Sequence, residues 1–214
     1  MIRQVLVYVE GPADSAAYEA LLRPLIDAKV ENGVAVSFHP AWPGHNKESI
    51  LRDLPRRAAD ILTGRGDIAV VAMPDLHPRD CVAPHGTPEE LRAELAGRFC
   101  AELARRGIDD QRIAERFHVH CAKHDLEALV LACPESLARE LGCSAVERTW
   151  TEATEDQDFG SPPKRIVERL FTRHGRTYRA PAHAPRILAG ASYQELAERC
   201  PQCFGPFVAL LEGL

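Results

Sequence analysis

The chain has 214 residues, of which 45% are hydrophobic and 27% are charged, and its formal net charge at pH 7 is −5. This composition is typical of one main globular domain and excludes a disordered or fibrous chain. The mildly acidic balance excludes a broadly basic nucleic-acid-binding surface, but it is compatible with a local basic patch.

The sequence pattern predicts neither a membrane span nor a cleavable signal. No window approaches the roughly 18 uninterrupted apolar residues of a membrane span, and the N-terminus runs into a strand without a cleavable signal. The seven cysteines are odd in number and scattered, which favours reduced thiols over a disulfide framework. We therefore expect a cytoplasmic protein. The pair in "CPQC" (200–203) has metal-like spacing, but a zinc site is not favoured because no second such pair accompanies it.

The first third of the chain alternates strands and helices. Residues 4–10, "QVLVYVE", form an apolar, β-branched run, and Gly11 and Pro12 follow as the expected cap and first residue of a helix. Residues 33–41 predict a second strand. The nearly continuous apolar run at 67–75 predicts a third strand that is covered on both faces.

The segments between and after these strands have patterns that predict helices. Residues 45–64 predict a helix that Pro55 is expected to bend or break. Thr87 and Glu90 stand in capping-box positions at the start of a helical pattern over 87–107.

The next segments complete the alternation. Residues 116–123 predict a fourth strand, which leads into helix-like segments at 124–132 and 134–142. After about residue 145 the chain is polar and rich in turns. It then gives a short helix from Pro163, a basic stretch, and a capped helix over 192–200.

Strands separated by helices favour an α/β fold with a mostly parallel, four-stranded sheet between helices. The change in character divides the chain into an expected α/β core over residues 1–144 and a C-terminal helical extension over 145–214, packed on that core.

Three carboxylates fall where such a sheet binds its ligands. Glu10 and Asp75 end the first and third strands, and Asp14 lies in the first turn of the helix after Glu10. If the strands are parallel, all three converge on the edge formed by the carboxyl ends of the strands. Clustered acids are usually held ionised by a divalent cation, and oxygen ligands suit magnesium. The implied chemistry is phosphoester cleavage or transfer.

Simpler roles exist for each acid. Asp14 could stabilise the positive end of its helix, and Asp75, between Pro74 and Leu76, could be a turn residue. Glu10 is harder to explain in this way, because glutamate is disfavoured in strands and turns more often use Asn or Asp. We therefore favour the metal site.

A second polar group, "KHDLEAL", follows the fourth strand. His124 and Glu127 are three residues apart, so on a helix they share a face and either could reach the same cleft. The alternative is that Asp125 and Glu127 only cap the helix.

Three segments resemble a known family. "LVYVEGPADSAAYEALL" is similar to the opening motif of Toprim domains, and Asp75 falls where their second acidic motif begins. "KHDLEALVLACPESLARELG" and the segment from "SPPKRIVERLF" to the C-terminus are similar to characteristic segments of the bacterial domain-of-unknown-function family 4276 (DUF4276), a Toprim-like group. The resemblance covers nearly the whole length.

The resemblance implies a Toprim fold and a nuclease related to those of the overcoming-lysogenisation-defect class, in which acidic residues bind Mg²⁺ or Mn²⁺ and nucleic acid is cleaved. It also implies an antiviral or mobile-element setting with a partner ATPase. The implied metal ligands are Glu10, Asp14, Asp75 and Glu127, and Glu10 and Lys164 are the implied catalytic residues. Phosphates would contact Lys164, Arg165 and Arg179, while the expected supporting residues around the metal are His77, His124 and Asp125.

The sequence departs from the Toprim pattern in two places. His77 replaces the second aspartate of the DxD motif, and Cys133 stands where the family segment often has an aspartate. A single carboxylate after the third strand fits a one-metal mechanism better than a two-metal one.

Two other functions remain open. The first is a non-catalytic binding or scaffold subunit that keeps the Toprim shape. The second is a receiver-like phosphoacceptor at Asp75, which is less favoured because receivers place an adjacent acidic pair after their first strand.

Overall fold

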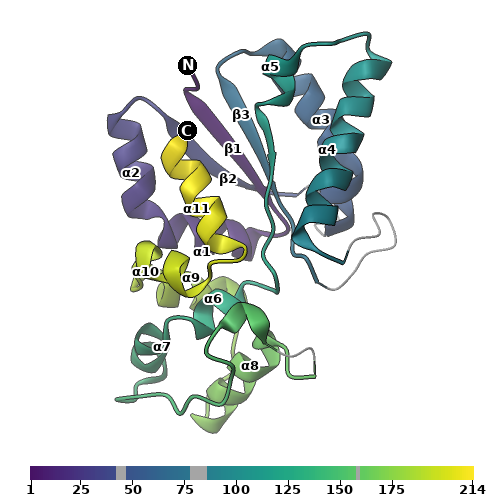
Figure 1. Ribbon diagram of the computed structural model, residues 1–214. Helices are drawn as coiled ribbons and strands as arrows, with labels where there is room; N and C mark the ends of the chain where they lie inside the picture. Colours follow the sequence, from purple (N-terminus) through teal and green to yellow (C-terminus); the bar gives the residue numbers. More distant parts are fainter. Residues whose placement is uncertain (42–46, 78–85, 158–159) are drawn as a thin grey trace.

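The computed structural model describes residues 1–41, 47–77, 86–157 and 160–214. Its centre is a sheet of four parallel strands in the order β2-β1-β3-β4 (Figure 1). Helices lie on both sides of this sheet, so the expected α/β architecture with a parallel, four-stranded sheet between helices is confirmed. The strands are β1 (Gln4–Val9), β2 (Ala35–Pro40), β3 (Ile68–Met73) and β4 (Phe117–Val119).

The strands are held in register, so that their carboxyl ends meet at one edge. Val9, the last residue of β1, pairs with both Pro40 and Met73, the last residues of its two neighbours. The strand β4 is shorter than the predicted 116–123, because beyond Val119 the chain bridges the sheet only at Asp75 and Ala122.

Alternating residues of the strands build two hydrophobic clusters, one on each face of the sheet. On one face, Leu6 and Val70 pack with helices α3 (Lys47–Gly64) and α4 (Pro88–Arg105). On the other, Val5 and Val7 pack with α1 (Pro12–Leu21), α2 (Arg23–Glu31) and α11 (Phe204–Gly213). Because both faces are covered, the edge formed by the strand ends is where polar side chains can gather.

Local rules explain where most helices begin. α1 starts with Gly11 as N-cap and Pro12 at its first position, as predicted. Thr87 and Glu90 form the predicted capping box of α4: the Glu90 N–H donates to Thr87 Oγ1 over 3.1 Å, and the Thr87 N–H donates to Glu90 Oε2 over 3.2 Å.

Of the two effects expected of Pro55, a bend or a break, the break does not occur: α3 continues through this residue. Pro55 is buried, and Leu54, Ala58 and Ala59 around it are also buried in the core. Tertiary packing therefore outweighs the cost of a proline inside the helix. The first two residues of that predicted helix, 45–46, lie outside the described residues.

The rest of the chain is helical and packs against the first helix. α9 lies along α1, and one hydrophobic cluster contains residues from both the 1–144 and the 145–214 segments. Within the described ranges, none of the helices combines the length and the apolar composition needed to cross a bilayer. The remaining helices are α5 (Gln111–Ala114), α6 (Glu127–Leu131), α7 (Pro134–Leu141), the short 3₁₀ helix η1 (Thr154–Asp156), α8 (Pro163–Arg173), α9 (Ala180–Ala189) and α10 (Tyr193–Arg199).

Candidate functional site

Glu10 and Asp75 lie together at the carboxyl ends of two neighbouring strands. Glu10 follows β1 directly, and Asp75 comes two residues after β3. The backbone N–H of Asp75 donates a hydrogen bond to Glu10 Oε1 over 3.0 Å. The parallel sheet therefore brings these two acids together, as the sequence predicted.

Asp14 lies in the first turn of α1, directly after this edge. Its Oδ2 accepts a hydrogen bond from the Gly11 N–H over 2.8 Å, so Asp14 also holds the start of the helix, as the simpler reading expected. Burial raises the pKa of Asp14, whereas the Gly11 hydrogen bond lowers it. The Asp14 carboxylate thus caps the start of α1 and also lies among the acids at the sheet edge.

The segment after β4 brings two more acids to the same place. The chain crosses the sheet edge where the Leu76 N–H donates to the Ala122 carbonyl oxygen, and it then turns into α6. Glu127, the first residue of α6, is only 3% exposed. Among the described residues, the buried Oδ1 of Asp125 has no hydrogen-bond partner. These five acids form what we call the acid cluster: Glu10, Asp14, Asp75, Asp125 and Glu127.

Electrostatics shows that the five carboxylates act on one another. Burial, followed by the charges of the other four members, raises the pKa of Asp75 well above its usual value. Burial and Glu127 raise the pKa of Asp125 to about 7. Burial also raises the pKa of Glu127. A site that buries several acids without enough positive charge disfavours their ionised forms, and a cation would relieve this cost.

Lys164 is the basic residue that acts on this cluster. It lies in the first turn of α8, and its ammonium lowers the pKa values of Asp14, Asp125 and Glu127. The structure therefore brings together Lys164 and all four predicted metal ligands.

The remaining predicted residues lie around this group or away from it. Arg165 follows Lys164 and is exposed, and Arg179 is exposed at the N-cap of α9. His77 and His124 lie near each other, with ring centroids 5.9 Å apart. The pKa of His124 is lowered by burial and by Lys123, while hydrogen bonds with the backbone of Glu155 and Gln157 raise it. His124 is thus engaged with the loop at η1.

Tyr178 is a candidate residue that the sequence analysis missed. Its ring packs against those of Phe171 and His183, at centroid distances of 5.0 and 5.7 Å. The hydroxyl is buried near Glu127, close enough for a hydrogen bond to lower the pKa of Glu127. That hydrogen bond falls short of regular geometry, however, and within the described chain the hydroxyl oxygen has no partner. In the sequence Tyr178 stands within the basic stretch and within the C-terminal segment that resembles the family, but neither feature points to a role beside the acids.

The donor set suits a hard divalent cation. Carboxylate oxygens are the ligands that Mg²⁺ and Mn²⁺ prefer, and the unpartnered Asp125 Oδ1 supplies a further acceptor within the cluster. In the part of the chain that the structure describes, however, no group of three or more His, Cys, Asp or Glu side chains is arranged so that it could hold a metal ion. A bound ion would require the carboxylates to turn toward one another.

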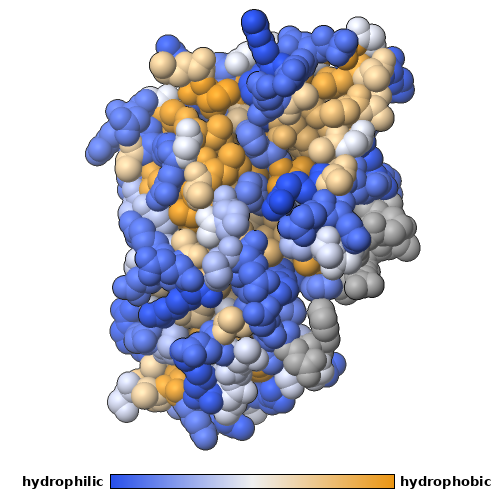
Figure 2. Space-filling model, viewed as in Figure 1, coloured by the Kyte–Doolittle hydropathy of each residue, from blue (hydrophilic) through white to orange (hydrophobic). Residues whose placement is uncertain are grey.

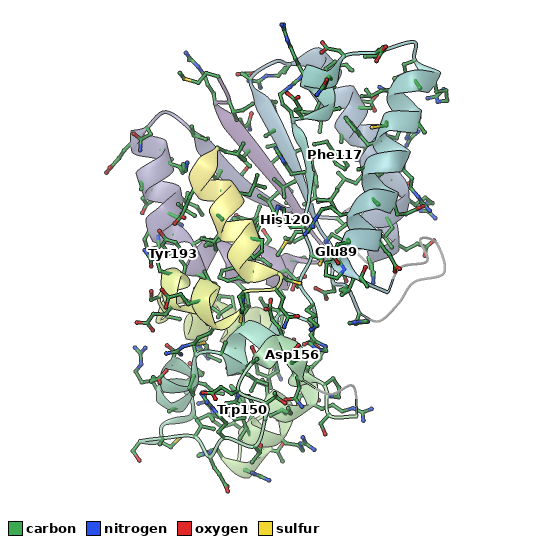
Figure 3. The ribbon with its side chains drawn as sticks, in the orientation of Figure 1. Glu89, Phe117, His120, Trp150, Asp156 and Tyr193 are labelled. Atoms are coloured by element: carbon green, nitrogen blue, oxygen red, sulfur yellow. The ribbon has the colours of Figure 1, made fainter. Side chains whose placement is uncertain are left out.

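The cysteines do not form a zinc site in the described residues. The Sγ atoms of Cys203 and Cys121 are 3.7 Å apart, while the Sγ of Cys200 lies 3.6 Å from Thr154 Oγ1. Cys121 follows His120 just beyond β4, on the path that Figure 3 shows running from Phe117 toward Asp156. The two cysteines of "CPQC" therefore face different neighbours.

Comparisons with known proteins agree with the resemblance found in the sequence. The model of the family "Domain of unknown function (DUF4276)" matches residues 9–212. A search of curated proteins finds no match. Among solved structures, the C-terminal region of the Burkholderia pseudomallei OLD protein aligns at 15% identity and a TM-score of 0.49, covering 100% of this chain and 98% of that chain. The C-terminal region of the Xanthomonas campestris pv. campestris OLD protein aligns at 15% identity and a TM-score of 0.42, covering 100% and 99%.

Proposed function

The chain belongs to the DUF4276 family, and from the geometry of its acid cluster we propose that it is a metal-dependent, Toprim-like nuclease that cleaves phosphodiester bonds in nucleic acid. One observation carries this proposal. Five carboxylates gather at the carboxyl ends of parallel strands, in surroundings that raise the pKa values of Asp14, Asp75, Asp125 and Glu127. Titratable groups perturbed in this way cluster at functional sites.

The proposed metal ligands are Glu10, Asp14, Asp75 and Glu127. A bound Mg²⁺ or Mn²⁺ would polarise the phosphate and make water a better nucleophile at neutral pH. Glu10 is oriented by the hydrogen bond that it accepts from the Asp75 N–H, which suits it to act as a general base.

Positive charge beside the cluster would bind the substrate. Lys164 already acts on three of the acids, and its ammonium would stabilise the negative charge that develops on the phosphate. Arg165 and Arg179 are exposed and would contact further phosphates, since a guanidinium pairs well with phosphate oxygens. Asp125, His77 and His124 would support the ligands from around the site.

The wider setting is proposed from the family resemblance alone. We place the protein in the cytoplasm, in antiviral or mobile-element defence, with an ATPase as partner. In this proposal residues 1–144 form the Toprim-like core, and residues 145–214 form the extension that supplies Lys164.

A non-catalytic binding subunit is the second candidate. The observation that favours it is that no group of three or more ligand-type side chains in the described ranges has a metal-holding arrangement. His77 in place of a second acid points the same way. Such a protein would bind nucleic acid or a partner protein through the same edge without cutting.

The test is cleavage of labelled single- and double-stranded DNA and RNA by the purified chain in Mg²⁺ or Mn²⁺, with and without EDTA. We expect metal-dependent products, and Glu10→Gln should lower the rate by at least about 100-fold. Glu31→Gln is the matched control, because Glu31 is an exposed glutamate at the end of α2.

Calorimetric titration with Mn²⁺ completes the test. Binding that Glu10→Gln and Asp75→Asn weaken supports the metal site. If neither cleavage nor Mn²⁺ binding is detected while nucleic acid still binds, the catalytic proposal is wrong and the binding subunit is favoured.

A further inference from the structure

The basic residues of α8 differ from most arginines of the other helices. Elsewhere the guanidinium groups are commonly neutralised: Arg52 pairs with Glu48 at 2.9 Å, and Arg105 with Glu102 at 2.7 Å. On α8, three exposed arginines make no ion pair with any described residue. We call them the arginine line: Arg165, Arg169 and Arg173.

The arginine line runs along one side of the helix. Its members are four residues apart, so their side chains follow one another along one face at steps of about 6 Å. The opposite face is fixed in the core by Ile166, Val167, Leu170 and Phe171. Lys164, in the first turn, acts on the acid cluster. The line therefore begins at the residue after Lys164 and extends for about 12 Å along the helix axis.

Helix stability does not explain this arrangement. A cation in the last turn, such as Arg173, interacts favourably with the helix dipole, but Lys164 and Arg165 stand in the first turn, where an acid would be favoured. Glu168 is the only acid on α8, and it makes no ion pair within the described chain. The positive charge of this face is left for an external anion.

A hollow lies between two members of the line. It has a volume of about 200 Å³ and is lined by Thr149, Ile166, Arg169, Leu170 and Arg173. Two arginines thus line a recess with room for a phosphate group and its water. The lower part of the face in Figure 2, where Figure 1 shows α7 and α8, is mainly hydrophilic.

We infer that the arginine line holds the phosphodiester backbone of a single nucleic-acid strand whose neighbouring phosphate lies at the acid cluster. Guanidinium groups bind phosphate oxygens in bidentate fashion, and a row of them suits a chain of regularly spaced anions. Because the net charge of the chain is −5, such binding must be local rather than general. This inference rests on the proposed function and adds to it the surface along which the nucleic-acid strand would bind.

The experiment measures binding without cleavage. A fluorescein-labelled single-stranded DNA is titrated with the full chain in EDTA, and its anisotropy is followed over a series of salt concentrations. The triple variant R165Q/R169Q/R173Q is compared with R52Q/R65Q/R105Q, which removes the same charge from arginines that are already paired with carboxylates.

Removing three phosphate contacts should flatten the slope of log K against log salt by about 2 and weaken binding at least about 10-fold. The control triple should keep the wild-type slope. Arg169→Glu provides a second variant with a single exposed substitution, in case the triple variant does not fold. It should weaken binding by more than Arg52→Glu does.

The outcomes separate this inference from the proposed function. Equal slopes and affinities in the two triples, or no binding of the DNA by the wild-type chain, overturn the inference even if the protein cleaves nucleic acid. Selective loss of DNA binding in the arginine-line triple variant supports the inference. This holds even if the wild-type chain never cleaves nucleic acid, a result that would contradict only the catalytic proposal.

Discussion

Two places in the described part of the chain bury carboxylates, and their surroundings affect the negative charge in opposite ways. Glu155, in η1, is only 3% exposed, and its carboxylate accepts N–H groups from Gln202, Cys203 and Phe204 over 2.7, 2.9 and 3.2 Å. In the acid cluster, by contrast, Asp125 Oδ1 has no partner in the described chain, and the pKa of Asp125 is raised to about 7.

The difference separates an acid that the fold satisfies from the acids to which we assign a function. Glu155 satisfies orphan N–H groups at the start of α11, so its charge is solvated by the fold and ties the η1 loop to the C-terminal helix. In the acid cluster the carboxylates repel one another and Lys164 offsets only part of this repulsion, so ionisation of the cluster costs stability unless a ligand supplies positive charge. Variants of the two sites should therefore move stability in opposite directions.

The largest effect on stability is expected at Glu155. Glu155→Gln keeps the side-chain volume but replaces one acceptor oxygen with an amide and removes charge-assisted hydrogen bonds. The free energy of unfolding should fall by about 1.5–3 kcal/mol, measured by urea denaturation followed by circular dichroism. Glu152→Gln, in the same loop, is the control, because the Glu152 side chain is 93% exposed. Equal midpoints for the two variants would show that Glu155 contributes nothing special to the fold.

Tyr178 tests whether the acid cluster is organised to receive a ligand. Its hydroxyl lies beside Glu127 without a regular hydrogen bond, so Tyr178→Phe should change stability little. If the hydroxyl orients Glu127 when metal is bound, the variant should weaken Mn²⁺ binding by about 10- to 100-fold in a calorimetric titration.

The matched control for Tyr178 is Tyr193→Phe. Tyr193 also lies beside a carboxylate, that of Glu212, but on the short helix α10. Unchanged Mn²⁺ affinity in Tyr178→Phe, with wild-type binding otherwise intact, would mean that the hydroxyl only fills space next to Glu127.

The sequence predicted the features that depend on neighbouring residues along the chain: the strands, the acids at their ends and the helix caps. Hydrophobic periodicity located all four strands, and in a parallel sheet the ends of β1 and β3 must share an edge, so the meeting of Glu10 with Asp75 followed directly. The capping residues Thr87 and Ser192 were also recognised, because the pattern that identifies them spans only four residues.

Features that depend on tertiary packing were missed. The helix α9 was not predicted, since Pro185 inside it counts against a helix, yet it is held along α1 by buried residues such as Ile187 and Leu188. The local sequence does not reveal the partners of Glu155 and Tyr178: those of Glu155 are 47 to 49 residues away, and that of Tyr178 lies on α6. Contacts between distant segments cannot be read from the spacing of residues in one segment.

The smallest predicted change in stability concerns Asp125, and the direction of its pKa shift determines whether stability rises or falls with pH. Because its pKa is raised from 3.8 to about 7, the folded metal-free chain holds a proton in a pH range where the unfolded chain has lost it. Raising the pH from about 4 to about 7 therefore favours unfolding, and the loss persists at higher pH.

Asp125→Asn removes this penalty, so in EDTA at pH 8 the variant should be more stable than the wild type. We expect a difference of about 1 kcal/mol in the free energy of unfolding. The difference is this small because Asp125 and Glu127 titrate together and neither carries the full pKa shift. At pH 4 the advantage should vanish, since the wild-type carboxyl is then protonated as well. Urea midpoints at both pH values measure the effect, and Asp27→Asn, an exposed substitution on α2, should leave the pH dependence unchanged. An Asp125→Asn variant that is less stable than the wild type at pH 8 would place Asp125 with Glu155, among the acids that the fold needs ionised.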